Sequence, residues 1–212
     1  MGRRTASPCL RGKKDKMRKI LFFDTETTGL PQFYNAPITQ VNNWPRLVQL
    51  AFIEYYEDGS LASKHNYIIK PEGFLIPRDA TLIHRISNEK AQTEGKDLTQ
   101  VLDIFADAIT ESAILIAHNF DFDRNIVGAE FVRKDFDTKP LLTKRSFCTM
   151  KSKDVVNFCK IKGNNGYKWP RLDELYLRLF HQRLNDAHDA SIDIEATAKC
   201  FWELLSRGVI RA

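Results

Sequence analysis

From residue 18 onward, the chain begins with short apolar runs separated by polar turns. The apolar run within residues 18–24 predicts a buried strand. Residues 46–59 and 60–71 predict two further strands joined at Asp58-Gly59, a dipeptide typical of tight hairpin turns. Between the first strand and this hairpin, residues 31–45 are rich in Pro and Asn and predict a loop.

Helical periodicity dominates the rest of the chain. Residues 97–110 repeat apolar side chains every three or four positions, which predicts an amphipathic helix. The pattern predicts further helices around 78–84, 122–134, 151–159, 171–180 and 193–207, the last ending at Gly208, and short strands at 113–118 and 146–150. Early strands followed by alternating helices and strands predict an α/β domain whose mixed sheet is flanked by helices.

The net charge of +5 comes from one end of the 212-residue chain. Residues 1–19 carry eight Lys or Arg side chains against Asp15 alone, a charge of +7 that leaves −2 for the remainder. We favour a disordered arm over residues 1–17, or a remnant upstream of a start at Met17, followed by one domain over 18–212. A tail that attracts nucleic acid is the alternative.

Hydropathy and cysteine usage exclude other classes of protein. No apolar run approaches the length of a membrane span, and none near the N-terminus resembles a signal peptide. The four cysteines are scattered without a CxxC or CxxH pair, which indicates neither a zinc site nor a disulfide framework. We therefore expect a cytoplasmic protein with no membrane partner.

Two carboxylates, Asp24 and Glu26, come directly after the first apolar run. Because side chains in a strand alternate between faces, both acids point the same way and Thr25 points opposite. Neighbouring carboxylates repel unless a cation lies between them, and Mg²⁺ takes oxygen ligands of this kind. Residues 27–29 then predict a turn whose N–H groups suit a polar or anionic group. Acids that are merely solvated at a strand end are the alternative.

Two later segments place further acids at helix starts. Asp123 follows the strand ending at His118-Asn119, and with Asp121 as helix cap it would face the sheet edge. His188 and Asp193 would lie about 140° apart on one helix, so they converge only if His188 belongs to the preceding loop. A loop histidine near metal-bound acids suits a general base. Structural Asp residues in first helical turns and an exposed loop histidine are the alternatives.

The three segments together resemble the DEDDh exonucleases, the DnaQ-like branch of the ribonuclease H-like superfamily. Residues 24–29 match the family's DxExTG motif with one extra Thr, 118–123 match HNxxFD, and 188–193 match HxAxxD. The resemblance covers residues 18–206 and is nearest to exonuclease domains of the DNA polymerase III epsilon-subunit type. It implies a ribonuclease H-like mixed five-stranded β-sheet flanked by α-helices. Arg85 stands where the family usually has Gly.

The resemblance also implies a chemistry, namely removal of nucleoside 5′-monophosphates from a 3′ end by two-metal-ion hydrolysis. Asp24, Glu26 and Asp193 would hold one Mg²⁺ or Mn²⁺ ion. Asp24 and Asp123 would hold the second ion, and His188 would take the proton from the attacking water.

Substrate contacts follow from the same motifs. Thr27, Gly29 and Leu30 would contact the terminal nucleotide, with Leu30 as a wedge against the last base. Asn119 would order the site or contact substrate. Phe120 is the expected stacking platform for a base, and Phe122 is expected in the core.

The sequence leaves the substrate class open. We favour single-stranded or frayed DNA, with RNA trimming by the same fold as the alternative. A non-catalytic nucleic-acid-binding module and a metal-dependent phosphatase or nucleotide hydrolase are the other classes. A DNA polymerase is a predicted partner, a homodimer is a further prediction, and the chain's end shortly after the last helix favours a stand-alone enzyme or a domain of a longer protein.

Overall fold

A mixed five-stranded sheet with the order β3-β2-β1-β4-β5 forms the centre of the protein. The computed structural model describes residues 17–184 and 189–211, so residues 1–16 of the predicted basic arm and His188 lie outside the described residues. The strands of this sheet are β1 (Lys19–Thr27), β2 (Leu47–Tyr56), β3 (Leu61–Ile68), β4 (Ser112–Ala117) and β5 (Ser146–Cys148). β1, β2 and β3 pair antiparallel, whereas β4 and β5 join parallel to β1.

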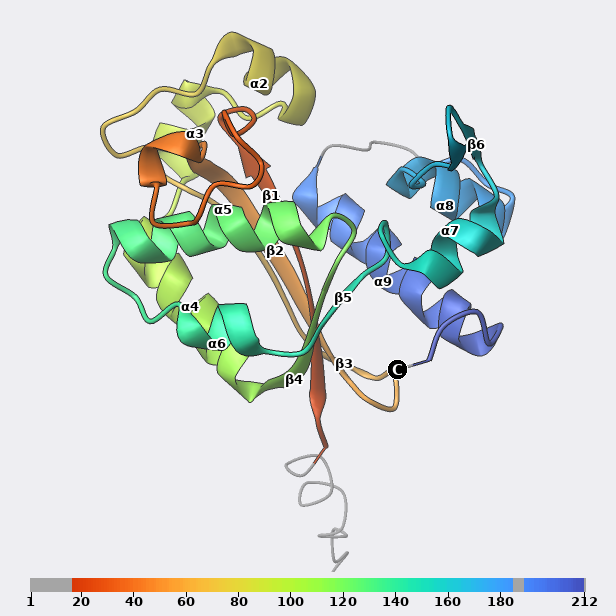
Figure 1. Ribbon diagram of the computed structural model, residues 1–212. Helices are drawn as coiled ribbons and strands as arrows, with labels where there is room; N and C mark the ends of the chain where they lie inside the picture. The colour runs from red at the N-terminus through yellow and green to blue at the C-terminus, as the bar shows by residue number, and fades with distance from the viewer. Residues whose placement is uncertain (1–16, 185–188, 212) are drawn as a thin grey trace, which may run out of the picture.

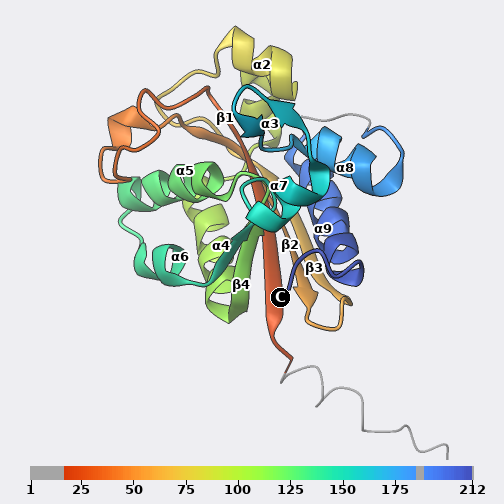
Figure 2. The ribbon, with the colours of Figure 1, turned by 45° about the vertical axis from the view of Figure 1, so that its right-hand side comes forward.

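Helices cover both faces of the sheet (Figure 1). The described helices are η1 (Val41–Asn43), α2 (Arg78–His84), α3 (Asn88–Glu94), α4 (Leu98–Glu111), α5 (Phe120–Arg133), α6 (Lys139–Thr143), α7 (Lys153–Cys159), α8 (Leu172–Phe180) and α9 (Ala190–Ser206). In Figure 1, α4, α5 and α6 lie on one side and α7, α8 and α9 on the other, and Figure 2 again shows α4–α6 opposite α8 and α9. None of the helices in the described ranges has the length and apolar character needed to cross a bilayer.

The central strand β1 is buried on both faces, and its side chains alternate between two cores. Leu21 and Phe23 pack with residues of α4 and α5. Ile20 and Phe22 pack instead with residues of α8 and α9. The apolar run of β1 is therefore continuous, because helices cover both faces of this strand.

Most predicted elements are confirmed. The hairpin turns at Asp58-Gly59, where Gly59 has a φ of +82° and its N–H donates to the Tyr56 carbonyl. The pattern missed the short helices α3 and α6, which are too brief to show helical periodicity. It also missed the two-residue strands β6 (Lys162–Gly163) and β7 (Gly166–Tyr167), which pair as a small hairpin inside a predicted loop.

Candidate active site

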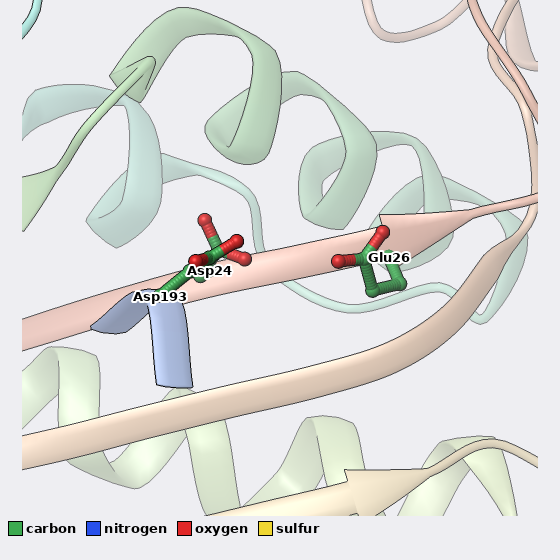
Figure 3. A group of neighbouring side chains, drawn as sticks. All are labelled: Asp24, Glu26 and Asp193. Carbon is green, nitrogen blue, oxygen red and sulfur yellow. The ribbon is translucent and has the colours of Figure 1, made fainter. Parts of the chain in front are cut away.

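Three carboxylates meet at the end of β1. Asp24 and Glu26 extend from the same face of the strand, and Asp193 approaches them from the first turn of α9 (Figure 3). One oxygen from each of the three side chains lies within 4.8 Å of the others. All three residues are partly buried. The alternation of the strand therefore gathers the acids as predicted, and a helix far along the chain completes the group.

This group is electrostatically unfavourable while the acids are ionised. Burial, followed by the charges of Asp123, Asp193 and Glu26, holds the pKa of Asp24 well above its usual range. Burial, followed by the charges of Asp193 and Asp123, raises the pKa of Glu26 to about 8. Clustered oxygen donors with raised pKa values are the donor set that a hard divalent cation would neutralise.

Asp123 approaches β1 from the opposite helix layer. Its Oδ1 accepts hydrogen bonds from the Thr25 backbone N–H at 3.0 Å and from the Thr25 hydroxyl at 2.7 Å. Burial raises the pKa of Asp123 to about 7, although the Thr25 hydrogen bonds act in the opposite direction. Asp123 is outside the group of three found among the described residues, but its charge raises the pKa of both Asp24 and Glu26. Thr25, the residue between the two acids, is a positioning residue that sequence reasoning missed.

The predicted helix cap for α5 was wrong. Asn119, not Asp121, is the N-cap residue. The Asp121 carboxylate instead lies 2.8 Å from Lys151 Nζ and 3.4 Å from an Arg124 guanidinium nitrogen. Because α5 already begins at Phe120, Asp121 lies inside the first turn, and its carboxylate pairs with these two cations.

The start of α9 is tied to β2 beside Glu26. Gln49 lies opposite Glu26 in the β1–β2 ladder. The Gln49 amide donates to Asp189 Oδ1 at 3.3 Å, and the Ala190 N–H donates to Gln49 Oε1 at 3.3 Å. Asp189 also caps the helix by accepting from the Ser191 N–H. Gln49 is a second positioning residue that the pattern did not reveal, since nothing in a strand sequence shows which distant helix it will contact.

In the turn after Glu26, Leu30 is exposed, as expected for a residue that contacts substrate. Gly29 has a φ of +151° and nothing lies within 4 Å of the place a Cβ would take. The Leu30 side chain is 72% exposed, whereas Thr27 is buried and its hydroxyl donates to the Gly29 carbonyl at 2.6 Å. A residue other than glycine would be strained at this φ, so Gly29 sets the shape of the turn that presents Leu30.

Of the two phenylalanines of the HNxxFD segment, Phe120 needs correction, whereas Phe122 packs against the core as expected. Phe120 is only 4% exposed and packs edge-on against Phe23, with 5.7 Å between ring centroids, so it has no free face for a base. Phe122 is partly buried and packs against the same core, while also lining a surface cavity with Asn119. The reason is the helix start: α5 begins at Phe120, which turns that ring inward.

Comparison with known proteins agrees with this geometry. The model of the RNase T family, described as exonuclease, matches residues 21–201, which span every described element from β1 to most of α9. The chain belongs to this exonuclease family. The exonuclease domain thus has the DnaQ-like, ribonuclease H-like architecture that the motifs predicted.

Several bacterial polymerases contain a segment similar to this exonuclease domain. The chain is 29% identical over 185 residues to a DNA polymerase III PolC-type of Streptococcus pyogenes serotype M2 (strain MGAS10270), covering 86% of this chain and 11% of the polymerase. It is 26% identical over 162 residues to the PolC-type polymerase of Mycoplasmopsis pulmonis (strain UAB CTIP), covering 76% of this chain and 10% of that protein. The chain thus spans about a tenth of the length of these relatives.

Solved structures show the same fold. E. coli exonuclease I in complex with a dA16 oligonucleotide superimposes with a TM-score of 0.71 and 20% identity over 90% of this chain and 41% of that one. A zinc-bound form of an E. coli exonuclease I complex with single-stranded DNA gives the same TM-score and identity over 91% of this chain and 41% of that one.

Proposed function

We propose that this exonuclease domain is a divalent-metal-dependent 3′→5′ exonuclease that acts on single-stranded or frayed DNA and releases nucleoside 5′-monophosphates. The observation that carries the proposal is the convergence of Asp24, Glu26 and Asp193 within 4.8 Å, with Asp123 held behind them by Thr25. These are the carboxylates that the exonuclease motifs supply.

The donor set fits two Mg²⁺ or Mn²⁺ ions. Asp24, Glu26 and Asp193 would hold one ion, and Asp24 with Asp123 would hold the other, because oxygen ligands of raised pKa favour a hard cation. When bound, such ions neutralise the charge that develops on the scissile phosphate and activate a water.

The remaining steps belong to the chain's own residues. His188 takes the proton of the attacking water, since a histidine with an ordinary pKa near 6.5 is suited to this task at neutral pH. Its chain neighbour Asp189 is held beside Gln49, opposite Glu26, which supports this role. Leu30 packs against the terminal base, and the turn at Thr27 and Gly29 contacts the terminal sugar.

The preference for DNA and the choice of partner draw on the relatives. The curated relatives described above are DNA polymerases, and the two structural neighbours are complexes with a deoxyadenylate oligonucleotide or single-stranded DNA. We accordingly propose DNA as the substrate and a DNA polymerase as a partner. RNA trimming is the competing substrate class, and a homodimer stays a prediction that light scattering of the purified protein would test.

Hydrolysis of 5′-labelled DNA and RNA of identical sequence tests the proposal. We expect a ladder that shortens from the 3′ end of DNA with Mg²⁺, disappears with EDTA, and is lost in Asp24→Asn. The control variant Asp103→Asn, at an exposed position of α4, should cleave like wild type. No cleavage of either strand with Mg²⁺ or Mn²⁺ would refute the enzyme, and faster cleavage of RNA would reverse the substrate assignment.

A further inference from the structure

A cavity of about 590 Å³ opens at the first turn of α5, the turn that also carries Asp123. Its walls come from residues 34–38 of the Pro- and Asn-rich segment, from Asn119 and Phe122, and from Lys151 and Trp169. The volume lies within the range of about 300–1,000 Å³ typical of ligand pockets. The catalytic carboxylates do not line it, so it forms a separate compartment next to them.

Two exposed aromatic side chains line this cavity. Trp169 is 57% exposed and Tyr34 is 58% exposed. Large aromatic side chains usually bury most of their surface, so two open ones in a single cavity leave flat apolar faces available to a ligand.

Cations accompany the aromatic rings. Lys151 Nζ lies 5.2 Å from the centre of the Trp169 ring. Arg124 also lines the cavity and shares the carboxylate of Asp121 with Lys151, at 3.4 Å and 2.8 Å respectively. Two cations against one carboxylate leave the lining net positive, and Asp121 holds the cations in place.

The wall carrying Trp169 is attached to the end of β4, the strand that pairs with β1. His118, directly after β4, contacts the Pro170 carbonyl through Nε2 at 3.1 Å and the Thr149 hydroxyl through Nδ1 at 2.9 Å. Burial lowers the pKa of His118 to about 4, so the ring is neutral and one nitrogen donates while the other accepts. Nε2–H then donates to Pro170, which anchors the residue next to Trp169.

The opposite wall is fixed by a buried ion pair. Glu130 has no exposed side-chain surface and accepts from Arg46 at 2.9 Å, while Arg133 lies 3.0 Å away. Arg133 also donates to the carbonyls of Val41 and Trp44. Arg133 therefore attaches the Pro- and Asn-rich segment to α5 at Val41 and Trp44.

We propose that this cavity binds the single strand on the 5′ side of the terminal nucleotide, with a base stacked on Trp169 and a phosphate held by Lys151. The combination of a positive lining with open aromatic faces suits single-stranded nucleic acid of any sequence, because every base offers a flat face and every nucleotide a phosphate. The inference rests on the proposed exonuclease function. It adds a subsite that binds the strand on the 5′ side of the scissile bond.

Binding without hydrolysis tests the subsite directly. Anisotropy of 5′-labelled dT12 and rU12 would be measured in EDTA with the whole protein. We expect Trp169→Ala to weaken binding about 5- to 160-fold, which corresponds to the 1–3 kcal/mol that one stacked base supplies, and Trp169→Phe to retain most of the affinity. Tyr167→Ala is the matched control, because Tyr167 is a similarly exposed aromatic two residues before Trp169, in β7, and is not among the cavity residues.

The phosphate contact has its own readout. Lys151→Gln should reduce the slope of log affinity against log salt by about 0.7, the value for one phosphate contact on a single strand. The control Lys153→Gln, an exposed lysine two residues along the chain, should leave the slope unchanged.

Hydrolysis assays on the same strands separate the two proposals. If Trp169→Ala binds both strands as well as Tyr167→Ala does, the subsite is wrong, even where cleavage of dT12 shows that the exonuclease is right. If wild type binds neither strand, the subsite is also wrong. If a strand is bound through Trp169 but never cleaved, the subsite proposal is supported and the exonuclease proposal is refuted. Binding of only dT12 or only rU12 assigns the kind of strand.

Discussion

Replacing Glu26 by Gln should stabilise the metal-free protein while abolishing its activity. The raised pKa of Glu26, about 8 against an ordinary 4.5, means that the folded state resists ionisation of this carboxyl because of burial and then the charges of Asp193 and Asp123. A folded pKa above the unfolded one contributes stability that is complete below pH 4.5 and is lost as the pH rises toward 8. Gln keeps the shape of the side chain and removes the charge.

The size of the effect follows from the same shift. Each pH unit between the two pKa values costs the folded state about 1.4 kcal/mol, which gives an upper bound of about 3 kcal/mol at pH 7 and about 5 kcal/mol above pH 8. Rearrangement and partial exposure of Glu26 reduce this bound, so we expect a gain of about 1–3 kcal/mol at pH 8.5 and little or none at pH 5.

Urea unfolding in EDTA at pH 5, 7 and 8.5 measures this gain. Glu57→Gln, at an exposed position after β2, is the matched control and should change stability by less than about 0.5 kcal/mol at every pH. Added Mg²⁺ should raise the urea midpoint of wild type more at pH 8.5 than at pH 5. At each pH, it should raise the urea midpoint of Glu26→Gln less than that of wild type. A variant that is less stable than wild type at pH 8.5 in EDTA, or that keeps the wild-type pH slope, would refute the electrostatic reasoning.

Three further substitutions test how the site is held. Arg85→Gly should raise the free energy of unfolding by about 0.5–1 kcal/mol, because Arg85 ends α2 at a φ of +62° that favours glycine; an unchanged or lower melting temperature would contradict this. Thr25→Val should raise the pKa of Asp123 and increase the Mg²⁺ concentration for half-maximal hydrolysis several-fold at pH 7, and an unaltered Mg²⁺ titration would count against it. Glu130→Ala should cost about 3–5 kcal/mol in urea unfolding by stranding Arg46, whereas a loss below about 1 kcal/mol would show that the pair is dispensable.

Local pattern was sufficient for most of the fold. The apolar run of β1 and the helical stripe of α4 depend on residues next to one another, so each could be placed from the sequence. The same reasoning placed Asp24 and Glu26 on one face of the strand. Asp193 could be added from its motif and from the small and apolar neighbours that predicted its partial burial.

The errors arose where a distant residue decides the local structure. Asp121 has the chemistry of a helix cap, but Lys151, thirty residues away, binds its carboxylate. Phe120 has the chemistry of a stacking platform, but Phe23 and the start of α5 bury it. The Pro- and Asn-rich segment is held by Arg133 of α5, which the buried Glu130 pairs with, and nothing in the segment's own sequence indicates this contact.

The two aromatic residues that precede Asp24 explain how four acids from three elements come together. Phe22 packs edge-on against Phe201 of α9, the helix that carries Asp193, with 5.4 Å between ring centroids. Phe23 packs against Phe120 of α5, the helix that carries Asp123. Side chains alternate along β1, so Phe22 and Asp24 face α9, whereas Phe23 and Thr25 face α5. Phe22 and Phe23 thus pack each helix against the strand two residues before the position that faces its acid. Charge repulsion would drive the acids apart, and these apolar contacts oppose it, so the core beside the site holds the carboxylates where a cation can join them.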